Sequence, residues 1–435
     1  MSKMHKTPGD TAWFVHDRFG MFIHWGLYAL PARHEWVKNY ERTRDEDYDR
    51  YLKYFDPDLY DAREWAKMAK AAGMRYAILT TKHHEGFCLF DSAYTDYKCT
   101  NTPAGRDLVK EFVEAFRAEG LKVGFYYSLL DWHHPDFTID TCHPRRNDSD
   151  IQAQNEGRDM KRYAEYMRNQ VRELLTNYGK IDIMWFDFSY PGTPDPNRPW
   201  FRGKGAEDWE AEELIAVARS IQPNIMINNR SGIEQDLWTP EQYQPTEPLR
   251  HPVSGDLVVW EACQTFSGSW GYHRDESSWK SPRMLIEMLI QTVSLGGNLL
   301  MNVGPTARGY FDHRAVAALE TYAAWMKYNS RSIYGCTMEE EFTPPNGCRY
   351  TRSADGKRLY VHLMSYPFAY LELPGLAGKV EYIQFLHDAS ELRYTQGEVP
   401  HFSEGRSNKS DLLIITMPVV KPNVEIPVIE IFLKE

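Results

Sequence analysis

Two ionisable residues at the ends of apolar segments suggest covalent chemistry. The segment IDIMWFDF (181–188) is typical of a buried strand, yet it carries Asp187 between two phenylalanines. A carboxylate in apolar surroundings is costly unless it is paired or neutralised. Arg230 ends the segment NIMINNR (224–230), and a guanidinium within about 4–6 Å would keep Asp187 ionised. An ionised carboxylate against an aromatic wall suits a nucleophile that attacks an electrophilic carbon, and a structural ion pair is the alternative.

A nucleophilic carboxylate whose surroundings suit a sugar predicts a second carboxyl group that acts as acid and base. In retaining glycosidases the two groups lie about 5–5.5 Å apart. The candidates further along the chain are Glu241, Glu247 and Glu261. Glu261 is favoured if LVVWEACQ (257–264) is a strand that ends near it. Glu241 belongs to WTPEQYQP (238–245), on a long loop where a mobile acid/base would also be well placed.

The other apolar segments also end in polar or aromatic residues, namely His24, Trp25, His83, His84, Glu85, Tyr126, Tyr127, Asp131, Trp132, Asn228, Asn229 and Asn302. Together they indicate a pocket for a polyhydroxylated ligand, although a lone histidine at a strand end is more often structural. His83 and His84 are adjacent and reach one ligand only if the strand ends there. A metal site is the rival interpretation. We expect no metal, because the chain has no H-E-x-x-H motif and no Cys/His cluster at zinc spacing.

The elements that must position these residues alternate along the chain. Strand-like and helix-like segments follow one another from residue 19 to about 330, which predicts parallel strands joined by helices. The strand candidates are 19–26, 76–84, 122–132, 181–188, 224–230, 257–264 and 298–305. We expect an α/β fold, a (β/α)₈-like TIM barrel with one irregular unit, whose chemistry lies at the carboxyl ends of the strands. A doubly wound sheet is the competitor, but no G-x-G-x-x-G follows the first strand.

The pattern changes after about residue 335. Short alternating strands separated by Pro, Gly and Asp follow one another, with no helical pattern between them. This is typical of a small β-sandwich. We therefore predict a catalytic barrel over residues 1–335 and a C-terminal β-sandwich over residues 336–435.

Composition narrows the class of protein. The chain has 435 residues, a net charge of −11 and 14% aromatic residues. The acidic balance argues against nucleic acid as a partner, and no apolar run approaches the roughly 20 residues of a membrane span. The aromatic content fits either an aromatic core or platforms for sugar rings. The N-terminus has no apolar stretch of a secretory leader, and the six cysteines show no C-x-x-C spacing. We expect a cytoplasmic protein with reduced thiols, which can form a homo-oligomer. The alternative is a secreted protein whose leader has been removed.

The chain resembles the α-L-fucosidases of glycoside hydrolase family 29. The resemblance rests on a series of motifs in order rather than on a single motif. They are FGMFIHWG, EWVKNY, TKHHEGFCLFDSAYTDY, GRDLVKEF, VGFYYSLLDW, WFDF, NNRSG and WGYHRDESSWKSPRMLIEMLIQTVSLGGNLLMNVGPTARG. They cover residues 13–330, and the β-rich C-terminal part fits the family plan.

The resemblance implies retaining hydrolysis of terminal α-linked L-fucose from glycans, without a metal or other cofactor. It places the nucleophile on Asp187 and the acid/base on Glu241, with Glu261 as a rival that supports the site instead. It implies that the fucose is bound by His24, Glu35, Trp36, His83, His84, Tyr126, Trp185 and Arg230, with Trp270 near the methyl group. The alternatives are an α-L-galactosidase or related exo-glycosidase, a catalytically silent sugar-binding barrel and a metal-dependent hydrolase.

Two motifs depart from the family pattern. WFDFSYPG is unlike the commoner variants after the nucleophile, and NNRSG is the second departure. Where the family often has NDRWG, this chain has NNRSG, so that Asn229 and Ser231 replace an acidic and an aromatic residue. These positions are expected on the side of the leaving group. The departures therefore bear on linkage preference more than on the identity of the sugar.

Overall fold

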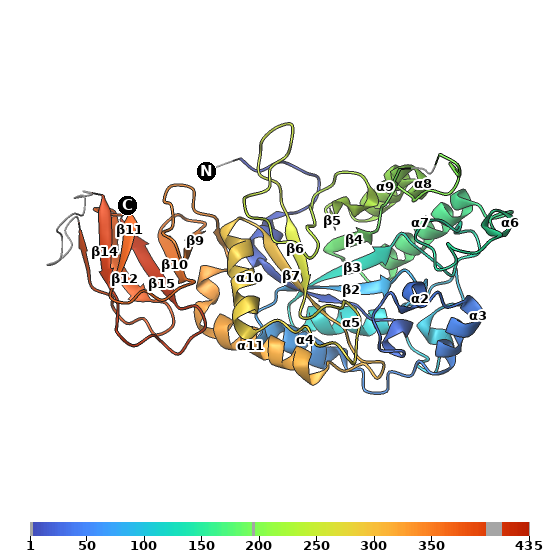
Figure 1. Ribbon diagram of the computed structural model, residues 1–435, viewed down its shortest axis with the longest axis horizontal. Helices are drawn as coiled ribbons and strands as arrows, with labels where there is room; N and C mark the ends of the chain where they lie inside the picture. Colours follow the sequence, from blue (N-terminus) through green and yellow to red (C-terminus); the bar gives the residue numbers. More distant parts are fainter. Residues whose placement is uncertain (1–2, 194–195, 397–410, 435) are drawn as a thin grey trace.

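The computed structural model describes residues 3–193, 196–396 and 411–434. Figure 1 shows an elongated molecule, with helices surrounding a central sheet over most of its length and antiparallel strands at the C-terminal end. The described helices are not long and apolar enough to cross a membrane.

Seven parallel strands form the central sheet, in the order β5-β4-β3-β2-β1-β7-β6. Their bounds are β1 (Phe19–Ile23), β2 (Tyr76–Lys82), β3 (Lys122–Ser128), β4 (Ile183–Asp187), β5 (Met226–Ile227), β6 (Glu261–Thr265) and β7 (Asn298–Val303). All of their residues are buried except Lys122, which is half-buried, as expected when both faces of a parallel sheet are covered. Apart from β5 and β6, strands that follow one another in sequence are neighbours in the sheet, and β7 lies beside β1, which is the order of a barrel. The predicted fold class is confirmed.

The irregular unit lies between β5 and β6. Here residues 237–242, which we call the closing segment, pair with β5 on one side and with the β6 side on the other through isolated parallel bridges. The bridged pairs are Asn228 with Leu237, Trp238 with Trp260, and Glu241 with Cys263. Backbone bonds from Asn229 N to Leu237 O (2.9 Å) and from Cys263 N to Pro240 O (3.0 Å) complete the closure. The closing segment takes the place of the eighth strand.

Helices cover the outside of the sheet. Their bounds are α1 (Ala12–Asp17), α2 (Val37–Tyr40), α3 (Asp45–Tyr48), α4 (Ala62–Ala71), α5 (Leu108–Ala118), α6 (Ile151–Gln154), α7 (Met160–Asn177), α8 (Ala206–Trp209), α9 (Ala211–Ile221), α10 (Pro282–Ser294) and α11 (His313–Asn329). Asp61, Asp107, Asp159 and Asp312 each cap a helix by accepting a backbone N–H. Residues 228–260, all of which the structure describes, contain no α-helix, so the closing segment lacks the helical cover of the other strands.

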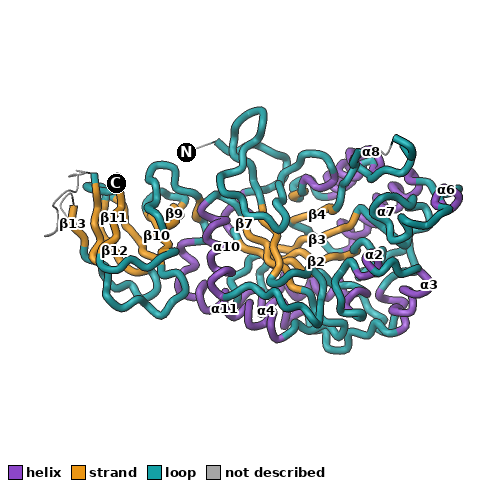
Figure 2. The backbone as a smooth tube through the Cα atoms, viewed as in Figure 1, coloured by secondary structure: helices purple, strands orange, loops and turns teal. Residues whose placement is uncertain are grey.

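The C-terminal part consists of two antiparallel sheets, in the orders β12-β15-β10-β9-β8 and β11-β14-β13. Their strands are β8 (Cys336–Thr337), β9 (Cys348–Ser353), β10 (Arg358–Leu363), β11 (Tyr370–Pro374), β12 (Val380–Phe385), β13 (Tyr394–Gln396), β14 (Leu412–Thr416) and β15 (Val428–Leu433). They enclose a hydrophobic core of their own, and Figure 2 shows them beside α10 and α11. Trp325 Nε1 donates to Ile426 O (3.3 Å) across this contact. The boundary at residues 335 and 336 stays a prediction.

Candidate active site

The carboxyl ends of the strands surround a narrow pocket. It is lined by Phe22, His24, Glu35, Trp36, His83, His84, Tyr126, Trp185, Asp187, Phe188, Glu241, Cys263 and Trp270. Its cavity volume is only about 30 Å³, well below the roughly 300–1,000 Å³ typical of ligand pockets, so the walls of the pocket lie close together. Strand β2 ends at Lys82, so both His83 and His84 lie in the turn that follows and both reach the pocket. The structure thus brings together every residue to which the family resemblance assigned a role except Glu261, with Arg230 joined through its ion pairs. The other candidates do not line the pocket, namely Trp25, Glu85, Tyr127, Asp131, Trp132, Asn228, Asn229, Glu247 and Asn302.

Asp187 is the last residue of β4, and its side chain is almost fully buried. Its Oδ1 accepts a hydrogen bond from Arg230 Nε (2.7 Å), and its Oδ2 accepts one from the Tyr126 hydroxyl (2.7 Å). Burial alone would raise the pKa of Asp187, but Arg230, His84 and the two hydrogen bonds together hold this pKa below its usual value. The carboxylate is therefore ionised at neutral pH and aimed into the pocket.

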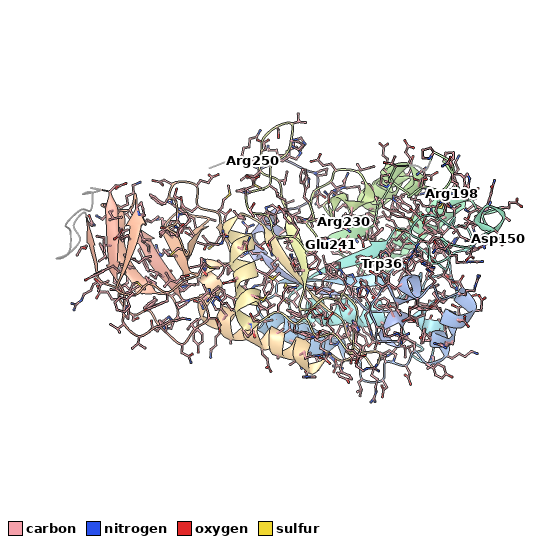
Figure 3. All side chains as sticks on the ribbon, viewed as in Figure 1. Trp36, Asp150, Arg198, Arg230, Glu241 and Arg250 are labelled. Carbon is pink, nitrogen blue, oxygen red and sulfur yellow. The ribbon has the colours of Figure 1, made fainter. Side chains whose placement is uncertain are left out.

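Glu241 lies on the closing segment, and its side chain is 37% exposed. Its Oε2 is 2.6 Å from Arg230 Nη2, so one guanidinium contacts both Asp187 and Glu241. Arg230 and Glu241 are labelled beside each other in Figure 3. Burial raises the pKa of Glu241; Arg230 opposes the rise and the negative charge of Asp187 adds to it, leaving a pKa above the usual value. The two carboxyl groups thus differ in the direction of their shifts although they share a partner.

Three histidines in the pocket are neutral. Burial lowers the pKa of His24 to about 3 and that of His84 to about 4, and it lowers the pKa of His83 well below its usual value. Asn302 Oδ1 lies 2.6 Å from His24 Nδ1, and Ser128 Oγ lies 2.6 Å from His84 Nδ1. A neutral imidazole carries one donor and one acceptor, which suits hydroxyl groups that do both.

Glu35 and the aromatic rings complete the walls. Glu35 Oε2 accepts hydrogen bonds from the backbone of Trp270 (3.1 Å) and Gly271 (2.9 Å), and burial raises the pKa of Glu35 to about 7. Trp185 stacks on Tyr126 with ring centroids 5.6 Å apart, and the Arg230 guanidinium lies 5.2 Å from the Trp185 ring. The aromatic faces can pack against the apolar face of a sugar ring, and the hydrogen-bonding groups beside them can bind its hydroxyls.

Glu261 lies outside the pocket. It is the first residue of β6 and pairs with Asn298, the first residue of β7. The expectation that Glu261 stands at a carboxyl end was therefore wrong, because β6 begins at the residue where we expected it to finish. The Tyr76 hydroxyl donates to Glu261 Oε2, and burial raises the pKa of Glu261 to about 8. Glu261 is a buried core acid that is protonated at neutral pH.

Comparison with known proteins agrees with this geometry. A sequence model of the family named alpha-L-fucosidase matches residues 3–331. The chain belongs to the α-L-fucosidase family. It is 30% identical over 389 residues to the human plasma alpha-L-fucosidase, an alignment that covers 82% of this chain and 76% of the human protein. The chain is thus a glycoside hydrolase of the α-L-fucosidase class.

Solved structures of α-L-fucosidases share the whole fold. Isoenzyme 1 from Paenibacillus thiaminolyticus superposes with a TM-score of 0.89 at 44% identity, covering 98% of this chain and 99% of that one. An α-L-fucosidase of family 29 from Bacteroides thetaiotaomicron superposes with a TM-score of 0.81 at 27% identity. That alignment covers 100% of this chain and 99% of that one. The matches span the C-terminal sheets as well as the barrel.

Several residues of the fucosidase pocket escaped the sequence-based prediction. Phe188 follows Asp187 in the left-handed backbone region (φ 85°), which bulky residues rarely adopt. This conformation turns its ring toward Trp36 and His84, at centroid distances of 5.3 and 5.1 Å. Phe22 and Cys263 also line the pocket. Inward alternation along β1 and β6 was the only signal for these two residues.

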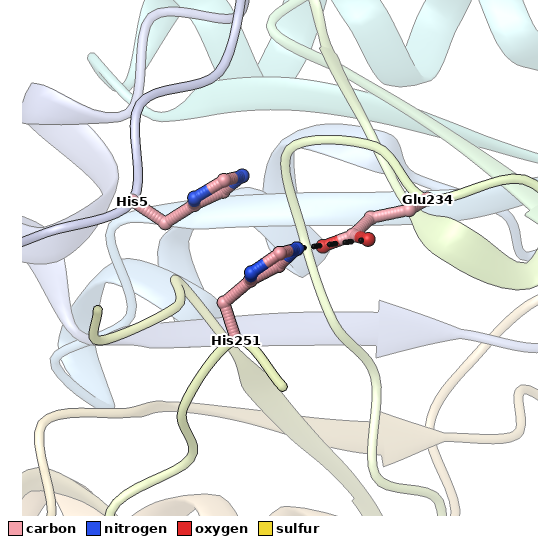
Figure 4. A group of neighbouring side chains, drawn as sticks. All are labelled: His5, Glu234 and His251. Atoms are coloured by element: carbon pink, nitrogen blue, oxygen red, sulfur yellow. Dashed lines mark ion pairs between the residues drawn. The ribbon is translucent and has the colours of Figure 1, made fainter. Parts of the chain in front are cut away.

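A second cluster of metal-ligating residue types lies away from the pocket. Figure 4 shows His5, Glu234 and His251, whose ligand atoms lie within 4.8 Å of one another. Ser254 N donates to His251 Nδ1 (3.1 Å), which places the ring proton of neutral His251 on Nε2, and Nε2 faces Glu234 at 3.4 Å. A metal ligated at Nε2 needs the proton on Nδ1 instead. The arrangement is therefore a contact between His251 and Glu234, with the His5 ring stacked on His251 at 4.3 Å.

Proposed function

We propose that the protein is a retaining exo-α-L-fucosidase that removes terminal α-linked L-fucose by double displacement. Asp187 acts as the nucleophile, Glu241 as the acid and base, and fucosylated glycans are the substrates. The contact of one guanidinium, Arg230, with both carboxyl groups carries the proposal. It brings together, in one small pocket, a carboxylate whose pKa is lowered and a carboxyl group whose pKa is raised.

In the first step Asp187 attacks the anomeric carbon while Glu241 gives its proton to the glycosidic oxygen, and the alcohol leaves. In the second step Glu241 takes a proton from water, the oxygen of that water attacks the anomeric carbon, and the bond to Asp187 breaks. Two inversions retain the configuration of the sugar. The opposite pKa shifts of Asp187 and Glu241 suit these two roles.

The neutral histidines and the aromatic walls favour L-fucose as the bound sugar. His24, His83 and His84 offer donors and acceptors to ring hydroxyls, and His83 Nδ1 has no hydrogen-bond partner within the described chain. Phe22 and Trp270, with ring centroids 6.0 Å apart, provide an apolar corner for the methyl group. α-L-Galactose would bring a hydroxymethyl group to this corner and is expected to react more slowly.

A structural relative supports the covalent step. The Bacteroides thetaiotaomicron structure is described as a trapped covalent intermediate formed with 2-fluoro-fucosyl fluoride, in a glutamate-to-glutamine variant. Its fold matches this chain over its full length. The same kind of intermediate on Asp187 is the natural counterpart here.

The cytoplasmic location stays a prediction, because human and rat relatives are named as plasma enzymes.

Hydrolysis of an aryl α-L-fucoside, followed by proton NMR during the first minutes, tests the proposal. The first sugar released should be α-L-fucose, and an aryl α-L-galactoside should react more slowly. Release of β-L-fucose first would overturn the double displacement. Loss of activity in EDTA, restored by added metal, would favour the metal-dependent alternative.

A further inference from the structure

The closing segment carries Glu241 but has no helix to hold it, which raises the question of what fixes its position. The residue that precedes it, Asp236, has a fully buried side chain. Asp236 Oδ1 accepts a hydrogen bond from Gly9 N (2.7 Å), and Oδ2 accepts one from Ile227 N (2.8 Å) and another from the Arg219 guanidinium. This carboxylate therefore joins α9, β5 and the N-terminal part of the chain at the start of the closing segment.

The N-terminal residues run along the far end of the same region. Leu257 N donates to Lys3 O (2.9 Å), and His5 N donates to Leu257 O (2.7 Å). The His5 ring stacks on His251, as Figure 4 shows. Residues 3–10 thus hold both ends of the stretch that runs from Asp236 to Leu257, and Glu241 lies within that stretch.

We propose that Asp236, held by the N-terminal residues through Gly9, is a positioning residue that keeps Glu241 at the distance needed for proton transfer. The inference rests on the proposed role of Glu241 as acid/base. Asp236 touches neither Asp187 nor the pocket, so its effect passes through the backbone of the closing segment.

The hydrogen bonds explain how Asp236 acts. Asp236 Oδ2 binds the N–H of Ile227, and the C=O of the same residue accepts a hydrogen bond from Leu237 N (3.2 Å). The N–H and the C=O of Ile227 are therefore bound by two consecutive residues, Asp236 and Leu237, which fixes the register between β5 and the closing segment. A shift in this register moves Glu241 along the barrel wall, and a misplacement of about 1 Å can cost a factor of 10² in rate.

Gly9 offers a sharp way to disturb this contact. A Cβ atom at Gly9 would lie 2.6 Å from Asp236 Oδ2 and 2.7 Å from its Cγ, closer than real Cβ atoms approach. The backbone of Gly9 is not in the left-handed region, so Gly9→Ala introduces only this clash. Relief of this clash moves either the Asp236 carboxylate, and with it the start of the closing segment, or Gly9 itself, and both movements disturb the contact between Gly9 and Asp236.

The test compares two leaving groups by kcat/KM, which reports the steps up to the fucosyl-enzyme. Fluoride leaves α-L-fucosyl fluoride with little help from an acid, whereas a fucosyl-lactose needs a proton on its leaving oxygen. Gly9→Ala and Asp236→Asn should each lower kcat/KM at least tenfold for the fucosyl-lactose and less than twofold for the fluoride. Lys6→Ala, at an exposed position of the same N-terminal segment, should leave both values unchanged.

Each outcome has a definite reading. An equal loss on both substrates, or no loss on either, in the variants that fold would show a merely structural contact and overturn the proposal. Asp236→Asn keeps the side-chain shape and serves if Gly9→Ala does not fold. Glu241→Gly provides the reference: if it lacks the selective loss, the proposed acid/base is wrong. If it has the loss and Gly9→Ala and Asp236→Asn do not, only the positioning role fails.

Discussion

The regular part of the barrel and its helix-free part each supply one of the two proposed catalytic carboxyl groups. Asp187 ends a strand that pairs with β3 over five residue pairs. The backbone around Glu241 pairs with its neighbours through isolated bridges rather than through a continuous strand ladder. The nucleophile is thus fixed by the sheet itself, whereas the acid/base depends on contacts from segments that are distant in sequence.

The carboxyl groups of the two regions also differ in their exposure to solvent. The Asp187 side chain is about 10% exposed and tightly hydrogen-bonded, and the Glu241 side chain is 37% exposed. A nucleophile needs a fixed, ionised oxygen, while an acid/base must exchange its proton with water between the two steps. The more open, irregular region is suited to the second task.

Removal of the nucleophile should give the largest effect. Asp187→Gly should lower kcat for an aryl α-L-fucoside by about 10⁴-fold or more, because no covalent intermediate can form. Sodium azide should restore turnover and yield β-L-fucosyl azide, identified by NMR. Near-normal activity without azide would show that Asp187 is not the nucleophile.

Removal of the acid/base should be milder and should depend on the leaving group. Glu241→Gly should lower kcat/KM by about 10²–10⁴-fold for a sugar leaving group and far less for fucosyl fluoride. Azide should here give the α-azide, since the nucleophile remains. Glu247→Gly, at an exposed position a few residues further on, is the matched control and should behave as the parent enzyme. The same α-azide from Glu261→Gly, and none from Glu241→Gly, would move the role to Glu261.

Loss of the shared guanidinium should affect both regions at once. Arg230 lowers the pKa of Asp187 and opposes the rise in the pKa of Glu241. Arg230→Gln should therefore shift both limbs of the kcat/KM pH profile to higher pH and lower its maximum by about 10²–10³-fold. A shift of one limb alone would mean that Arg230 serves only one carboxyl group.

The smallest effect is expected at the buried acid at the opposite end of the barrel. Burial raises the pKa of Glu261 to about 8 from an ordinary value of 4.5, so the folded state holds a proton that the unfolded state releases. Its contribution to stability is therefore full below about pH 4.5 and is lost as the pH rises to about 8. Glu261→Gln should flatten the fall of Tm over this range by a few degrees and change kcat/KM less than twofold. An unchanged slope of Tm against pH would contradict the raised pKa.

Local patterns in the sequence were enough to predict the regular region. The apolar runs of β1 to β4 are continuous, and polar residues follow each of them directly, so the positions of His24, His84 and Asp187 could be predicted. The family resemblance added Glu35, Trp36 and Trp270, which lie on connecting segments with no periodic signal.

The helix-free region could not be predicted in the same way, because its pairing is non-local. The run 257–264 looks like one strand, but Leu257 pairs with Met4 and Trp260 with Trp238, and β6 begins only at Glu261. The closing segment contains Pro240, which is typical of a loop rather than of a strand. The closing segment takes the place of an eighth strand because it pairs with segments on both sides. Those segments are distant in sequence, so a local sequence pattern does not indicate the pairing.

The loop that follows Gln242 has a consequence for how this enzyme can diverge. It begins beside Glu241, the proposed acid/base, and ends at Leu257, which the N-terminal residues hold. Doubling the length of a flexible loop costs only about 0.6 kcal/mol in closure entropy. Insertions here can therefore change the surroundings of Glu241 at a small cost in free energy and without disturbing Asp187. Under the proposed mechanism, linkage preference can then differ among related chains while the residues that bind fucose stay the same.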